Sequence, residues 1–308
     1  MCAVFDSLDA LPANAALAVG TFDGVHKGHQ AILNAMTAFA HATGRAPWVL
    51  SFASPPTALL NPSANKGAIY DAVLQASYLQ QTGASFIRQP FDSAFAARTA
   101  EAFLVSLRQA VIFCGKDWRF GKGAEGDVRF LEAHHACVHV VPDVDYEGER
   151  ISSTRIRQAI QAGALDSVAA MLGRPWEFVG VVQHGRALAG KVFGVPTLNI
   201  PYIGRFGEPL LPLAHGVYCG EATVIRKGEV LQTASALINF GIAPSVKNEK
   251  VPLFEVHLLD TVGDFYGAEV ILRIHHPRLR PEKKFDSLDM LKAQIHDDLV
   301  RCRSVLNQ

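Results

Sequence analysis

The hydrophobic positions of the chain follow two different patterns, one in each half. In the first half, short apolar runs at 16–19, 48–52, 111–114 and 138–141 are followed by segments of helical spacing. Runs of this length, bounded by Gly, Pro or polar residues, are typical of buried parallel strands. Between the first two runs, apolar residues recur at helical spacing over 32–40, which predicts an amphipathic crossover helix. The first half is therefore predicted to be an open α/β sheet, whose ligands bind beyond the carboxyl ends of the strands.

From about Trp176 the pattern changes to an alternation of apolar and polar residues. The candidate strands are 177–183, 217–225, 230–240, 253–259 and 269–275, separated by Gly, Pro and polar turns. This pattern predicts a small antiparallel β-barrel. A terminal helix should follow, capped by Ser287 or Asp286, with an apolar stripe formed by Leu288, Leu291, Ile295, Leu299 and Cys302. We therefore expect one domain over residues 1–175 and another over residues 176–308.

Composition narrows the classes of function that the chain can have. Its 308 residues are 49% hydrophobic, with 29 Lys plus Arg against 29 Asp plus Glu, so it should be globular and have no net field to hold nucleic acid or a membrane surface. The five cysteines contain no close pair, which argues against a disulfide framework or a zinc knuckle and favours a reducing compartment. No leader pattern and no run of about 18 apolar residues is present. We expect a cytoplasmic, soluble protein that binds phosphates only at local sites, with self-association left open.

A first candidate site follows the first apolar run, where the sequence reads GTFDGVHKGH, residues 20–29. Gly20 and Gly24 allow tight turns, and Gly28 leaves room for a phosphate at the start of the helix. His26 and His29 are three residues apart, so in a first helical turn they share a face at the positive end of the helix dipole. Such a pair can stabilise charge on a transferring phosphate without a protein nucleophile. Taken alone, the pair is more often an ordinary solvated or capping pair.

A second candidate anion site lies downstream, in ISSTRIRQAI, residues 151–160. Hydroxyls, backbone N–H groups and guanidinium groups meet there at a predicted helix start. A Ser/Thr-rich helix start is, by itself, usually only a cap. The residues of this segment that would contact phosphate are Ser152, Ser153, Thr154, Arg155 and Arg157.

Together, these two motifs resemble the adenylyltransferase half of the bifunctional bacterial riboflavin kinase/FAD synthetase family. The resemblance implies a Rossmann-like nucleotidyltransferase domain in which the FMN phosphate attacks the α-phosphate of ATP and pyrophosphate leaves. It adds Phe22 and Asp23 to the ATP-binding residues of the first motif. GKDWRFGKGAEGD, residues 115–127, resembles the middle motif of the family, with Asp117 as an FMN-binding residue.

The middle motif also contains a GxGxxG pattern, at Gly121, Gly123 and Gly126, with Asp143 about 20 residues further on. A dinucleotide fingerprint needs its first glycine at the end of a strand, whereas residues 116–120 separate these glycines from the preceding run. A dehydrogenase is therefore disfavoured, and without GxxxxGK[ST] a P-loop kinase is disfavoured too.

The second half carries GKVFGVPTLN, residues 190–199, which resembles the kinase motif of the same family. Thr197 can offer a hydroxyl and Asn199 a carbonyl oxygen to Mg²⁺, which prefers oxygen ligands and bridges phosphates. Alone, a Pro-Thr pair in such a loop is more often simply a turn. The resemblance implies that ATP is bound in the kinase half by Gly190, Lys191, Gly194, Pro196 and Asn239.

NFGIAPS and LFEVHLLD, residues 239–245 and 253–260, also resemble family segments. By this resemblance Glu255 is the base that accepts the proton of the ribityl 5′-hydroxyl of riboflavin as that oxygen attacks a γ-phosphate. Without the resemblance, Glu255 would be read as a surface residue on a half-exposed strand. The chain departs from the family patterns in both halves, namely in SFASPP at 51–56 and at Gln75, Lys191, Leu198 and Ser245.

The resulting hypothesis is a bifunctional transferase that converts riboflavin to FMN and FMN to FAD, with ATP and Mg²⁺. One alternative is a riboflavin kinase whose adenylyltransferase half is weakened and serves as a flavin- or nucleotide-binding module. The others are a lone nucleotidyltransferase with an accessory barrel and a flavin-binding regulatory protein without activity.

Overall fold

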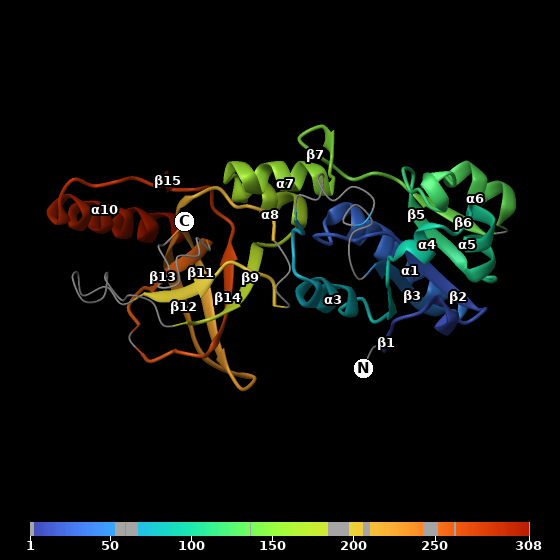
Figure 1. Ribbon diagram of the computed structural model, residues 1–308, viewed down its shortest axis with the longest axis horizontal. Helices are drawn as coiled ribbons and strands as arrows, with labels where there is room; N and C mark the ends of the chain where they lie inside the picture. The colour runs from blue at the N-terminus through green and yellow to red at the C-terminus, as the bar shows by residue number, and fades with distance from the viewer. Residues whose placement is uncertain are drawn as a thin grey trace. The chain divides into compact units, whose positions relative to one another are not determined.

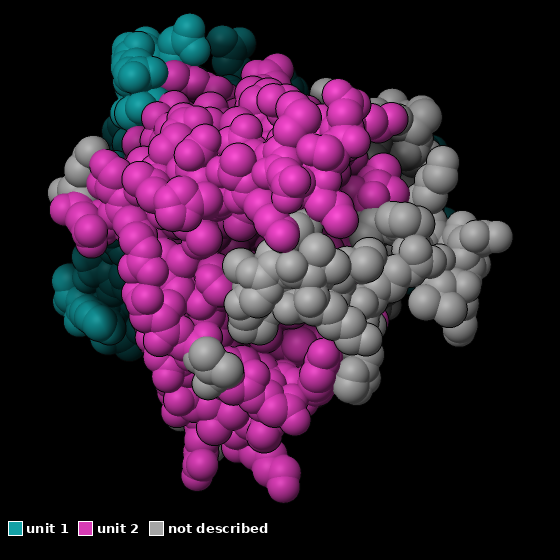
Figure 2. All heavy atoms as spheres, turned by 90° about the vertical axis from the view of Figure 1, so that its left-hand side faces the viewer, with its two compact units in different colours: residues 1–153 teal, residues 154–308 magenta. Residues whose placement is uncertain are grey.

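The computed structural model describes residues 3–52, 59, 67–135, 137–183, 197–205, 210–242, 252–261 and 263–307 (Figure 1). The chain forms two compact units, Met1–Ser153 and Thr154–Gln308, which are coloured separately in Figure 2 and called unit 1 and unit 2. The domain boundary was expected after residue 175, whereas the two units divide after Ser153. The helices α7 (Ser153–Ala162) and α8 (Leu165–Leu172) lie between these two positions in the chain. Each unit is described by itself below.

Unit 1 is built on a parallel sheet with the strand order β1-β4-β3-β2-β5-β6. Its strands are β1 (Val4–Phe5), β2 (Ala15–Val19), β3 (Ala46–Phe52), β4 (Ser85–Gln89), β5 (Val111–Gly115) and β6 (Val138–Val141). The four strands expected from the apolar runs are β2, β3, β5 and β6, so the predicted open α/β sheet is confirmed. β1, β4 and the hairpin of β7 (Asp145–Tyr146) and β8 (Glu149–Arg150) were not predicted.

Helices cover both faces of this sheet. One face packs on α1 (Lys27–Thr43) and α3 (Ala72–Gln80), through residues such as Leu33, Met36 and Leu79. The other face packs on α4 (Ser93–Ala96), α5 (Ala100–Ser106) and α6 (Val128–His134), through Phe95, Phe103 and Leu131. The described part of the unit also contains two short 3₁₀ helices, Leu8–Ala10 and Lys122–Ala124. Because both faces are covered, the central strands β2 and β5 are buried on both sides, which explains their continuous apolar runs, whereas no residue of the edge strand β6 is buried.

Unit 2 is built on a curled antiparallel sheet with the order β10-β13-β12-β11-β14-β9, and β15 also pairs with β11. The strands are β9 (Trp176–Val181), β10 (Leu198–Pro201), β11 (Gly216–Arg226), β12 (Glu229–Ile242), β13 (Pro252–Leu258), β14 (Glu269–Ile274) and β15 (Arg280–Pro281). The backbone N–H of Gln183, just after β9, donates to the carbonyl of Asn199 in β10 at 2.8 Å, so the two ends of the sheet meet. The predicted small antiparallel barrel is confirmed, with β10 and β15 as strands that the pattern did not predict.

The terminal helix α10 (Leu288–Leu306) begins after Ser287, whose hydroxyl accepts the N–H of Met290 at 3.2 Å. This confirms one of the two predicted caps. The predicted apolar stripe is wrong at its start, because Leu288 is 60% exposed. The helix instead packs on the sheet through its C-terminal half, from Leu299 to Leu306. Among the described residues, no helix combines the length and apolar composition that a membrane crossing requires.

Candidate functional site

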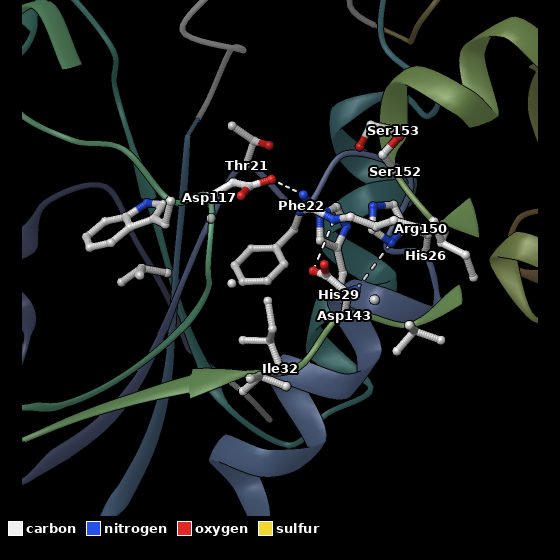
Figure 3. A pocket seen from close by; sticks show the side chains of 18 of the residues that line it. Thr21, Phe22, His26, His29, Ile32, Asp117, Asp143, Arg150, Ser152 and Ser153 are labelled. Atoms are coloured by element: carbon white, nitrogen blue, oxygen red, sulfur yellow. Dashed lines mark hydrogen bonds and ion pairs between the residues drawn. The ribbon is translucent and has the colours of Figure 1, made fainter. Parts of the chain in front are cut away.

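The main pocket of unit 1 lies where the strand order of the sheet reverses. Strand β3 lies on one side of β2 and β5 lies on the other, and a cavity of about 350 Å³ opens at the last residues of β2, β5 and β6 (Figure 3). Open α/β sheets bind their ligands at such a switch point. Eight residues expected from the motifs line this one cavity: Gly20, Phe22, His26, Gly28, His29, Asp117, Ser152 and Ser153.

The loop after β2 has an unusual backbone. Phe22, Gly24 and Val25 have φ angles of 48°, 80° and 41°, in the left-handed region that ordinary side chains avoid. Asp23 is 7% exposed, and its carboxylate accepts the backbone N–H of Ile69 at 3.0 Å. A strained backbone persists only where its surroundings over-determine it, and it is often found at functional sites.

Two residues that depart from the family patterns, Ser51 and Gln75, hold this loop by hydrogen bonds to the same backbone oxygen. The hydroxyl of Ser51 and the side-chain amide of Gln75 both donate to the carbonyl oxygen of Thr21, at 2.9 Å and 2.7 Å. Ser51 is fully buried at the end of β3, whereas Gln75 reaches the loop from α3. The changed residues therefore hold the loop at its start, and residues 53–56 of the same segment lie outside the described residues.

The two histidines lie together at the N-terminus of α1. His26 is the N-cap residue, and its Nδ1 accepts the backbone N–H of His29 at 3.3 Å. The two rings stack with centroids 3.6 Å apart, and the ring of Phe22 meets the His29 ring edge-on at 5.3 Å. In a neutral imidazole an accepting Nδ1 leaves the proton on Nε2, so the ring N–H of His26 is on Nε2. Gly28 packs against the same ring, since a Cβ at this position would lie 3.1 Å from Cε1 of His26.

The serine motif lines the same cavity through Ser152 and Ser153. Ser153 is the first residue of α7, and its hydroxyl donates to the carbonyl of Asp23 at 3.0 Å. Thr154, Arg155 and Arg157 follow in the first two turns of this helix. The start of a helix is the positive end of its dipole, which favours an anion.

Arg150 is a pocket residue that motif reading missed. It lines the cavity and pairs with Asp117, and its Nε lies 3.1 Å from Oδ1 of Asp143. Lys116 Nζ lies 2.5 Å from the other carboxylate oxygen of Asp143. The signal that could have found Arg150 is the turn sequence Glu147-Gly148 in front of it, because a Gly flanked by short polar runs is typical of a tight hairpin.

A second group of predicted residues forms a row across three strands of unit 2. Asn199 of β10 pairs with Glu255 of β13, which pairs in turn with Asn239 of β12. Paired residues of antiparallel strands share a face, and the side-chain amide of Asn239 donates to Oε2 of Glu255 at 3.2 Å. The neighbours Phe240 and Phe254 point the opposite way, into the core. Thr197 directly precedes β10 and is half-buried.

Several predicted kinase residues lie outside the described residues: Gly190, Lys191, Gly194, Pro196 and Ser245. The motif at residues 190–199 was read as a loop, but Asn199 lies in strand β10, which corrects that prediction for its last residues. Within the described part of the chain, no group of three or more His, Cys, Asp or Glu side chains could hold a metal ion. The side chains of Thr197 and Asn199 nonetheless offer oxygen atoms, which fit Mg²⁺ when phosphates and water complete its coordination.

Both halves of the chain match known families. Residues 9–155 match the FAD synthetase family, and residues 172–306 match the riboflavin kinase family. The chain is 35% identical over 301 residues to the bifunctional riboflavin kinase/FMN adenylyltransferase of Escherichia coli K12, covering 93% of this chain and 91% of that protein. Identity to the Pseudomonas fluorescens protein of the same name is 32% over 299 residues, with the same coverage. A crystal structure described as a macrolide-efflux protein from Streptococcus pneumoniae superposes with a TM-score of 0.84 at 28% identity, covering 97% of this chain and 98% of that one.

Proposed function

Because the chain belongs to the family of bifunctional riboflavin kinase/FMN adenylyltransferases, we propose that it carries out two successive transfers from ATP. The C-terminal half phosphorylates riboflavin to FMN. The N-terminal half adenylylates FMN to FAD and releases pyrophosphate. The observation that carries this proposal is the meeting of two histidines, two serines and an arginine in one cavity at the switch point of a parallel sheet.

In the adenylyltransferase half, an oxygen of the FMN phosphate attacks the α-phosphorus of ATP, and the bond to the oxygen shared with the β-phosphate breaks. Charge builds up on the non-bridging oxygens during this exchange, so fixed donors and cations lower its barrier. His26 and His29 supply ring N–H groups at a helix N-terminus, and Arg150 supplies a guanidinium group. Ser152, Ser153 and the start of α7, with Arg155 and Arg157, bind the other phosphates. Asp117 contacts FMN.

In the kinase half, Glu255 accepts the proton of the ribityl 5′-hydroxyl while that oxygen attacks the γ-phosphorus of ATP, and ADP leaves. A base needs a fixed position, and Glu255 has one because it lies within a strand and accepts a hydrogen bond from Asn239. Thr197 and Asn199 would hold Mg²⁺, which neutralises phosphate charge when bound. Residues 190–196, which precede Thr197 in the sequence, would contact the nucleotide.

We also propose that the two activities divide at residues 1–175 and 176–308 and that the protein works in the cytoplasm. The first point is supported by the change from helical to alternating pattern near Trp176, and the second by the lack of paired cysteines.

A product assay tests the whole proposal. The purified chain is incubated with riboflavin, ATP and Mg²⁺, and the flavins are separated by chromatography. We expect FMN first and FAD later. FMN without FAD would favour the kinase-only alternative, which the FAD synthetase match of residues 9–155 does not support. No flavin product at all would favour the binding protein.

A further inference from the structure

We propose that Asp143 is a positioning residue for the adenylyl transfer, which holds the guanidinium of Arg150 by its Nε atom so that the terminal nitrogens can meet the phosphates. This inference rests on the proposed function of unit 1 and gives a role to a residue that stood out in the sequence only as part of the rejected dinucleotide fingerprint. Both side chains are labelled in Figure 3, where they lie beside His29 and His26.

Arg150 forms ion pairs with two carboxylates. Its Nε lies 3.1 Å from Oδ1 of Asp143, and its Nη1 pairs with Asp117. A guanidinium has five N–H donors, of which only one is on Nε. The Asp143 contact therefore fixes the direction of the side chain while it leaves the terminal nitrogens for other acceptors.

The two carboxylates differ in exposure, and this difference assigns them different roles. The side chain of Asp143 is 19% exposed, against 59% for Asp117. An exposed partner is exchanged easily, because water and salt compete for it. We infer that Asp117 releases Nη1 when a phosphate arrives, whereas Asp143 stays on Nε.

A short hairpin brings the pair together. β7 and β8 pair Asp145 with Arg150, and the turn between the strands has Glu147 and Gly148 at φ 55° and 76°. Two successive left-handed residues are typical of the type I′ turn that closes two-residue hairpins. Asp143 lies two residues before Asp145, so it is the diagonal neighbour of Arg150 on the same face, which long side chains can reach.

Stability alone does not account for these contacts. Arg150 is 41% exposed and Lys116, the other partner of Asp143, is 60% exposed. Ion pairs that are this exposed contribute little to the stability of a fold. Loss of the contact at Nε should therefore change the stability of the fold little. The contact nevertheless determines where the guanidinium lies in the cavity, and small misplacements at a reacting centre lower the reaction rate strongly.

A double-mutant cycle on the full-length protein tests the proposal. The variants are Asp143→Ala, Arg150→Ala and the double variant, and the readout is kcat/KM for ATP in FAD formation from FMN. We expect Asp143→Ala to lower kcat/KM by about ten- to a hundredfold. In the Arg150→Ala background the same change should have less than about a threefold effect, since its only route is through the guanidinium.

Two further variants serve as controls. Asp143→Asn keeps one acceptor oxygen for Nε and should recover part of the lost activity. Lys116→Ala removes the contact to Oδ2 of Asp143, whereas Arg150 contacts Oδ1. This variant should keep kcat/KM within about threefold of the wild type. Riboflavin phosphorylation, measured in the same samples, should stay unchanged in every variant because it belongs to unit 2.

Each outcome bears on one claim. Equal losses from Asp143→Ala in both backgrounds, or wild-type activity of Asp143→Ala, would overturn the positioning role. Full activity of Arg150→Ala would overturn it as well, while the function of unit 1 would stand. Failure of the wild-type protein to form FAD would instead overturn the proposed function.

Discussion

The buried ion pair between Arg280 and Asp298 joins α10 to the sheet of unit 2. The loss of stability that follows from breaking this pair can be predicted. Asp298 is 2% exposed, and its two oxygens accept hydrogen bonds from Nε and Nη2 of Arg280 at 2.6–2.9 Å. Gln294 donates to the same carboxylate at 3.1 Å. Arg280 belongs to β15, which pairs with β11, so this pair joins the helix to the sheet.

We expect Asp298→Ala to destabilise the contact between α10 and the sheet by about 3 kcal/mol. Breaking a buried pair by removing one partner costs about 3 to 5 kcal/mol, because the remaining charge is left buried without compensation. The side chain of Arg280 is 17% exposed, so water can reach part of it, and the lower end of this range applies. Replacing both partners, in Arg280→Met with Asp298→Leu, should cost less than Asp298→Ala alone, because no uncompensated charge remains.

Amide hydrogen exchange, followed by mass spectrometry of peptides from residues 288–306, measures the local opening of this helix. A change of about 3 kcal/mol corresponds to exchange faster by about a hundredfold in Asp298→Ala. Asp297→Ala, which changes the exposed neighbour, is the matched control and should exchange like the wild type. The reasoning fails if Asp298→Ala behaves like that control, or if the double variant exchanges faster than the single one.

Three substitutions test the two sites separately. Glu255→Gln should lower FMN formation by at least about a hundredfold while conversion of FMN to FAD continues, as followed by chromatography; equal loss of both activities would contradict separate sites. His29→Ala should do the reverse, and retained FAD formation would rule out its role. Gly28→Ala should lower the kcat of FAD formation by about tenfold, because its Cβ would lie 3.1 Å from Cε1 of His26 and displace that ring. Wild-type kcat in Gly28→Ala would show that the ring position does not matter.

The central strands β2 and β5 of unit 1 were predictable because burial on both faces leaves an uninterrupted apolar run. β2 is buried along its whole length, and its run is correspondingly clear in the sequence. β4 was missed because only Phe86 and Ile87 of its five residues are buried, which is too short a run to separate from a helix. Apolar spacing also predicted too much contact for α10. The regular spacing begins at Leu288, although only the later turns of the helix pack on the sheet.

The candidate sites were predictable as motifs, but their supporting residues were not. The motifs contained the histidine pair because both residues belong to one helix start, a local feature. Arg150 depends on a hairpin that is defined by backbone angles at Glu147 and Gly148 rather than by apolar pattern. Asn199 and Glu255 are far apart in the chain and meet only through the register of β10 with β13, which sequence pattern alone does not determine.

The two sites also differ in how their positions are maintained, and this difference predicts how they respond to change. The site in unit 1 consists of loops held by side-chain bonds to backbone atoms, such as Ser51 and Gln75 on the carbonyl of Thr21. Each such bond can be replaced by another donor, because only the carbonyl has to be satisfied. The row in unit 2 is held by strand pairing, so Glu255 keeps its place whichever side chains surround it. We therefore infer that unit 1 can tolerate departures from the family pattern when they preserve a donor to Thr21, as both Ser51 and Gln75 do, whereas unit 2 tolerates side-chain changes that leave the register intact.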